Sequence, residues 1–241
     1  MINWKALVAE FIGTFTLVFV GSAAVWFAKT TPGYAAGPLV PAFAHGLVVV
    51  FAAYTLGKIS GAHLNPAVTV AVALANGIEW LKAALYIVVQ VVAGLAAAFI
   101  LNAILSVPGN PTQAALNFGA FSYNVNVTTS IGAMFAEAIL TFFLAFAVVM
   151  GAVYGRAGDF AGLAIGLTLA ASILAGGPIS EASLNPARSI GPAIVAGNLG
   201  AIWIYIIGPV LGAALASVLA SSAFNPNAPE RTPPKKNTGR R

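Results

Sequence analysis

Two identical tripeptides bring polar chemistry into an apolar sequence, Asn65-Pro66-Ala67 and Asn185-Pro186-Ala187. Proline suits the first turn of a helix, where its missing N–H would be unpaired anyway, so each tripeptide predicts a helix start. A helix N-terminus carries unpaired N–H groups and about half a positive charge. Each asparagine can cap its helix with the side-chain oxygen, or offer N–H donors to a water oxygen that passes by. The two roles are compatible.

Three charged residues also lie in apolar surroundings, Glu10, Glu137 and Arg188. Charged groups inside a bilayer are costly and therefore point to a function; for an arginine at the bilayer centre the cost is roughly 2.5–3.5 kcal/mol. We expect Glu10 and Glu137 to accept hydrogen bonds from the loops that precede the two tripeptides. A proton relay is the alternative, although no other acid lies at comparable depth to continue it.

Composition places most of the surface in lipid. Charged residues make up 7% of the 241 residues and apolar residues 59%, whereas an ordinary soluble domain has about 25% charged residues. The chain has no cysteine and two histidines, too few for a cysteine or histidine metal site. The scattered basic residues form no aromatic-studded patch for nucleic acid. Without a phosphate-binding loop or catalytic triad, we expect no enzyme activity, no metal and no cofactor.

Long apolar segments predict the fold. A spanning helix needs about 20 mainly apolar residues. Six segments reach this length, namely 5–27, 38–57, 81–105, 130–153, 160–178 and 200–222. Two shorter apolar segments, 66–76 and 186–197, begin at the tripeptides and predict half-helices that enter the membrane and stop. We therefore expect an all-α membrane protein with six transmembrane helices and two re-entrant half-helices.

An internal repeat relates the two halves. Residues 59–67 read ISGAHLNPA and residues 179–187 read ISEASLNPA, which differ at two of nine positions. Three spans separate the copies, so the second is inserted upside down, as in inverted-repeat membrane proteins that bind substrates near the midplane. We expect one domain over 1–222, with repeats of about 5–105 and 130–222. The basic, proline-rich tail 223–241 is expected to be disordered and cytoplasmic.

The distribution of lysine and arginine predicts the orientation. With both termini cytoplasmic, nine basic residues lie inside, one lies in an outer loop (Lys29), and Arg188 lies within the membrane. This asymmetry follows the positive-inside rule. The segment from Met1 to Lys5 is too polar for a signal peptide, so residue 1 is expected to belong to the mature protein. A multi-pass protein of the plasma (inner) membrane is expected.

The segments around the tripeptides, SGAHLNPAVT at 60–69 and SLNPARSIGPA at 183–193, resemble the signature segments of the aquaporin (major intrinsic protein) family. The resemblance extends over nearly the whole chain. It implies a homotetrameric, passive water channel in the lipid bilayer, which excludes protons and ions through facing half-helix dipoles as aquaporin-type channels do. It also implies that four residues form the narrowest constriction, namely His45, Ile173, Ala182 and Arg188.

This set of four is similar to the selectivity filter of the plant tonoplast intrinsic branch. That resemblance implies that small neutral solutes such as ammonia, urea, hydrogen peroxide and glycerol accompany water. Residues 106–129 contain no histidine, whereas some ammonia-permeable members of the branch carry one in this loop.

Two walls are expected for the pore. Irregular backbone at membrane depth is tolerated where it lines a wet cavity, so carbonyl groups before each half-helix should face water, namely those of Gly61, Ala62, His63, Glu181, Ser183 and Leu184. Leu17, Val49, Leu144 and Leu169 are candidates for an opposite, apolar wall, although core packing would explain them nearly as well. A secondary transporter is the competing function, because inverted repeats and broken helices occur there too.

Overall fold

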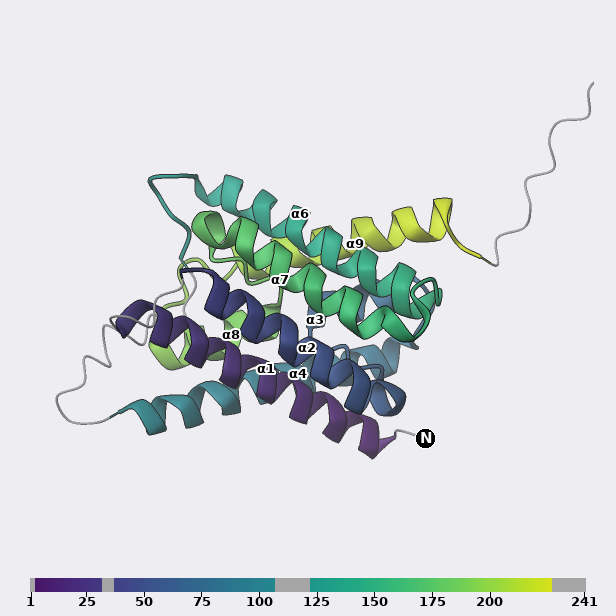
Figure 1. Ribbon diagram of the computed structural model, residues 1–241, viewed down its shortest axis with the longest axis horizontal. Coiled ribbons are helices and arrows are strands. Elements are labelled where there is room, and N and C mark those ends of the chain that lie inside the picture. Colours follow the sequence, from purple (N-terminus) through teal and green to yellow (C-terminus); the bar gives the residue numbers. More distant parts are fainter. Residues whose placement is uncertain (1–2, 32–36, 107–121, 227–241) are drawn as a thin grey trace, which may run out of the picture.

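The computed structural model describes residues 3–31, 37–106 and 122–226 and is a bundle of helices that run side by side (Figure 1). Within these residues, six helical segments are long and apolar enough to cross a membrane. These are α1 (Trp4–Thr30), α2 (Leu39–Ser60), α4 (Trp80–Leu105), α6 (Ser130–Val148) with a π-helical turn (Val149–Val153), α7 (Ala161–Ser180) after a 3-10 turn (Gly158–Phe160), and α9 (Ile204–Ala223). The described residues contain no β-strand. The predicted all-α membrane fold is confirmed.

Most predicted boundaries agree with the helices to within three residues. The predicted start of the last span at 200 is wrong, because residues 200–203 form turns and α9 begins at Ile204. Apolar composition extends through these turns, so hydropathy alone does not mark the helix start. Of the predicted tail, residues 227–241 lie outside the described residues.

Two short helices begin at the tripeptides, α3 (Pro66–Leu74) and α8 (Pro186–Ala196). They contain 9 and 11 residues, so at 1.5 Å per residue they would together span about 30 Å, one hydrocarbon thickness. Asn65 caps α3 by accepting a hydrogen bond from the backbone N–H of Ala67 at 2.8 Å. Asn185 caps α8 in the same way, accepting from Ala187 at 3.0 Å.

The helices pair in the pattern of an inverted repeat. α1 packs against α2 and α4, and α6 packs against α7 and α9 in the same way. Each half-helix also lies against the last span of the other half, α3 against α9 and α8 against α4. The start of α1 and the end of α9 lie at the same end of the bundle (Figure 1), as an even number of spans requires.

Glycines allow two of these contacts to close to backbone distance. A Cβ added to Gly191 in α8 would lie 2.4 Å from the carbonyl of Gly94 in α4. A Cβ on Gly212 in α9 would collide with the backbone of Ala138 in α6. Glycine at these positions therefore lets α8 approach α4, and α9 approach α6, to backbone distance.

A buried carboxylate holds the first re-entrant loop. Glu10 in α1 is fully buried, and it accepts hydrogen bonds from the backbone N–H groups of His63 at 2.9 Å and Leu64 at 2.8 Å. The side-chain amide of Gln90 in α4 donates a third bond at 2.8 Å. These contacts give partners to backbone groups that would otherwise be unpaired at membrane depth.

The second loop is held in the same manner. Glu137 in α6 is fully buried and accepts from the backbone N–H groups of Ser183 at 2.9 Å and Leu184 at 2.7 Å. Here the third donor is the Ser180 hydroxyl, at 2.7 Å. Both carboxylates therefore lie where a loop anchor must lie, with loop N–H groups as their partners.

We expect Glu10→Gln and Glu137→Gln to lower folded yield, because an amide in place of the carboxylate turns one N–H···O contact into a donor–donor contact. An unsatisfied buried donor costs roughly 1–3 kcal/mol. Size-exclusion chromatography and thermal unfolding in detergent measure the loss. Glu79→Gln is the matched control, because Glu79 is exposed and makes no side-chain cap bond. Normal yield together with an altered pH dependence of transport would favour the relay instead.

Candidate functional site

The two re-entrant loops meet through their asparagines. The Asn65 side-chain amide donates to the carbonyl of Leu184 at 2.8 Å, and that of Asn185 donates to the carbonyl of Leu64 at 2.9 Å. An amide nitrogen carries two N–H groups, and each of these bonds uses one. The side-chain oxygens of both asparagines accept the helix-cap bonds. The second N–H of each side-chain amide takes no part in any of these bonds.

A cavity of about 470 Å³ passes this meeting point. Its lining includes Asn65 and Asn185, and it extends from Lys82 at the start of α4 to His45 and Arg188. Both halves of the chain therefore contribute to one channel-like space. Its two asparagines lie at the N-termini of α3 and α8, where two half-helix dipoles present positive ends.

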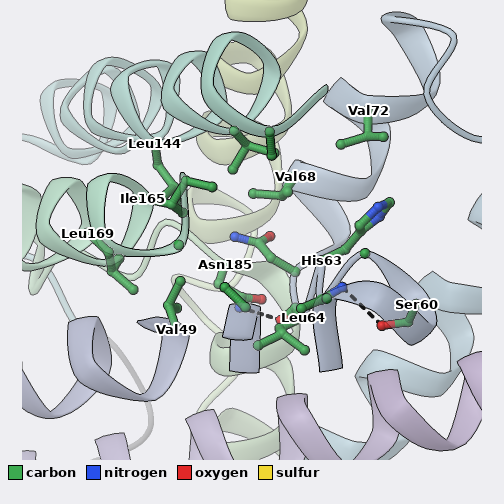
Figure 2. Close-up of a pocket in the computed structure, with 18 of the residues that line it drawn as sticks. Val49, Ser60, His63, Leu64, Val68, Val72, Leu144, Ile165, Leu169 and Asn185 are labelled. Atoms are coloured by element: carbon green, nitrogen blue, oxygen red, sulfur yellow. Dashed lines mark hydrogen bonds between the residues drawn. The ribbon is translucent and has the colours of Figure 1, made fainter. Parts of the chain in front are cut away.

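The cavity has an apolar wall and a polar wall. Leu144 from α6 and Leu169 from α7 lie on one side, and His63 of the first loop lies on the other, with Asn185 between them (Figure 2). The four predicted apolar wall residues, Leu17, Val49, Leu144 and Leu169, all line the cavity. An apolar wall opposite hydrogen-bonding loops can hold water while binding it weakly.

The predicted carbonyl-bearing residues divide into two groups. Gly61, Ala62, His63 and Ser183 line the cavity. Glu181 and Leu184 are absent from its lining within the described part of the chain. The carbonyl of Leu184 accepts the bond from Asn65 instead.

Three of the four predicted constriction residues are joined by hydrogen bonds. Arg188 donates from Nε to Nε2 of His45 at 2.5 Å, and from Nη1 to the carbonyl of Ala182 at 3.2 Å. Nδ1 of His45 lies 2.6 Å from the carbonyl of Pro41. Because a carbonyl only accepts, Nδ1 carries the proton and Nε2 is the acceptor for Arg188. Both imidazole nitrogens are thereby occupied.

The fourth constriction residue lies in apolar packing. Ile173 is 3% exposed and belongs to a buried cluster that also contains Ala182, Leu140 and Leu169. Of the predicted set, His45 and Arg188 line the cavity, whereas Ile173 and Ala182 do not within the described residues. The hydrogen-bonding groups at this end of the cavity therefore come from Arg188 and the residues bonded to it.

Sequence reasoning missed two supporting residues and one ion pair. Gln90 bonds Glu10, and a glutamine within an otherwise apolar span was a signal for it. Gly21 in α1 makes room for the ring of His45, since a Cβ there would collide with the imidazole. The carboxylate of Glu181 forms an ion pair with Lys29 at 2.7 Å. Lys29, predicted in a loop, lies in the last turn of α1.

Comparison with known proteins identifies the family. The family model described as Major intrinsic protein matches residues 1–220. Aquaporin NIP1-3 of Oryza sativa subsp. japonica is 42% identical over 210 residues, which cover 87% of this chain and 70% of that protein. Nodulin-26 of Glycine max is 40% identical over 210 residues, which cover 87% of this chain and 74% of that protein.

A solved structure shows the same fold. The aquaglyceroporin from Plasmodium falciparum superimposes with a TM-score of 0.79 at 24% identity, over 93% of this chain and 98% of that one. The family match, the relatives and the head-to-head half-helices agree. The chain belongs to the major intrinsic protein family, that of the aquaporins.

Proposed function

We propose that the protein is a passive channel for water, which also admits small neutral solutes and excludes protons and ions. The observation that carries this proposal is the cavity lined by both halves of the chain, with Asn65 and Asn185 in its lining. Relatives whose names describe them as aquaporins support the same function.

The geometry suggests how protons are excluded. The free N–H of each asparagine donates to a passing water oxygen, so that water points its hydrogens away from both half-helix termini. The positive ends of α3 and α8 oppose a cation at the same place, as in other aquaporin-type channels. Arg188 adds a full positive charge farther along the cavity.

The transporter alternative has less support. A coupled transporter needs an ionisable or cation-coordinating group on the substrate path. The ionisable residues that line the cavity in the described part of the chain are His45, His63, Lys82 and Arg188, with no carboxylate among them. Glu10 and Glu137 are absent from this lining, and their oxygens accept bonds from the loops. Their arrangement favours a passive channel.

Several further properties are part of the proposal. We place both termini in the cytoplasm, in the plasma (inner) membrane, because of the lysine and arginine asymmetry. We expect a homotetramer, as the family resemblance implies. The likeness of the constriction to the plant tonoplast branch stays a prediction, since the relatives reported above are NIP aquaporins and Nodulin-26.

Purified protein in liposomes should raise osmotic water permeability while proton conductance stays at the background of empty liposomes. Facing half-helix dipoles and Arg188 oppose proton passage, whereas neutral water meets no such barrier. Stopped-flow light scattering measures the water flux, and a pH-sensitive dye trapped in the same vesicles measures the proton flux. A proton current comparable to that of a proton channel would contradict this mechanism.

His45→Phe combined with Ile173→His should suppress urea and ammonia uptake while water flux largely survives. We expect the polarity of the wild-type constriction to come from Arg188, His45 and nearby carbonyls, since Ile173 supplies no hydrogen bond. An aromatic ring at position 45 and an imidazole at position 173 should narrow and polarise the constriction. Uptake of both solutes is compared between wild type and the double variant in the same vesicles. If wild type passes neither solute above empty liposomes, the channel is strictly water-selective and the broadened filter is wrong.

A further inference from the structure

The two copies of the repeat differ at a strained backbone position. Gly61 follows α2 with φ of 98°, and Glu181 follows α7 with φ of 63°. Glycine adopts this left-handed region freely, whereas a side chain there is disfavoured. Repeat one shows that glycine serves at the equivalent point of the loop. The other positive-φ positions of the two loops carry the same residue in both repeats, Ala62 and Ala182, and Leu64 and Leu184. The exchange of glycine for glutamate at this one position points to a role for the carboxylate.

That carboxylate ties the second loop to α1. Oε1 of Glu181 accepts from Nζ of Lys29 at 2.7 Å, with side chains 25% and 50% exposed. Its other oxygen is buried and has no hydrogen-bond partner. Lys29 lies in the last turn of α1, 152 residues away in sequence. The ion pair therefore joins the end of α1 to the first residue of the loop.

The tied residue lies next to the constriction. Ala182 directly follows Glu181, and its carbonyl accepts the bond from Nη1 of Arg188. The backbone N–H of Ala182 in turn donates to the Ser180 hydroxyl, at a distance of 3.3 Å. The equivalent bond of repeat one, from Ala62 to Ser60, measures 3.0 Å. At Ala182 the second loop thus has a longer hydrogen bond to its serine than the first loop has at Ala62. The second loop also has an ion pair to α1, through Glu181 and Lys29.

We propose that the ion pair between Lys29 and Glu181 is a specificity-determining clasp of the channel. It fixes the carbonyl of Ala182 and, through that carbonyl, the guanidinium of Arg188, which keeps the constriction narrow. This inference rests on the proposed channel function. Without the clasp, the loop end and Arg188 move more freely, and the constriction admits larger neutral solutes.

Thermal unfolding distinguishes a clasp that sets selectivity from an ion pair that only stabilises the fold. An exposed ion pair contributes little to folding, and Glu181→Gly also relieves the unfavourable φ at this position. We therefore expect Glu181→Gly to keep or raise the thermal unfolding midpoint while selectivity is lost. A structural ion pair would give the opposite pattern, with lower stability and unchanged selectivity.

The test compares urea and water permeability in proteoliposomes of wild type, Glu181→Gly and Lys29→Met. Both variants should raise the urea-to-water ratio by roughly two- to fivefold, the factor that corresponds to losing an exposed ion pair. Lys58→Met is the matched control, since Lys58 is an exposed lysine in the last turn of α2, and it should leave the ratio unchanged. Exchanging the charges, with Lys29→Glu and Glu181→Lys together, should restore a ratio near that of wild type.

The outcomes separate this inference from the proposed function. Wild type that conducts no water would overturn the channel function itself. Wild-type water flux with an unchanged ratio in Glu181→Gly and Lys29→Met would overturn the clasp alone. Should Glu181→Gly fail to fold, Lys29→Met and the charge exchange decide the question, because Lys29 is half exposed and helical.

Discussion

The channel depends on satisfying loop N–H groups inside the membrane. Non-helical backbone is tolerated at that depth only when protein or water pairs with it, and here a buried carboxylate accepts two N–H groups from each loop. Glu10 and Glu137 thereby fix where α3 and α8 begin. The helix starts then bring Asn65 and Asn185 together, each bonded to a carbonyl of the opposite loop. The cavity follows from this arrangement, because the loops occupy one side and apolar helix faces the other.

The two re-entrant loops are held in matching ways, but the residues that line the cavity differ between the two halves of the chain. Matching tyrosines bond the last helical turns before both loops, Tyr86 to the carbonyl of Ser60 at 2.9 Å and Tyr205 to that of Ser180 at 3.0 Å. Only the second half, however, places an arginine directly after its tripeptide. That arginine is held by His45 of the first half and by Ala182 of the second. The repeat therefore builds both loops that meet at the cavity, and Arg188, which has no counterpart in the first half, lines the cavity together with His45.

Local signals in the sequence predicted the half-helices and the buried glutamates. The features that the sequence did not predict depend mainly on contacts between residues far apart in the chain. The tripeptides predicted both half-helices because proline and asparagine act on the nearest turn. Glu10 and Glu137 were also recognisable from their own segments, because a charged residue within an apolar span is costly in a bilayer. The ion pair of Lys29 and Glu181 joins residues 152 positions apart, which no local pattern encodes. Gly21 carries no side chain to signal its contact with His45, and hydropathy does not distinguish the turns before α9 from a helix.

The central claim is that water crosses the membrane through the cavity between the loops and the apolar helix faces. The chain contains no cysteine, so a single introduced thiol can be blocked selectively with mercury. Leu169 lines the cavity, whereas Leu167 in the same helix is 49% exposed on the bundle surface. Stopped-flow measurement should show that mercuric chloride abolishes water flux through Leu169→Cys, reversibly with excess thiol, and spares Leu167→Cys. Undiminished flux through a fully labelled Leu169→Cys protein would contradict the account.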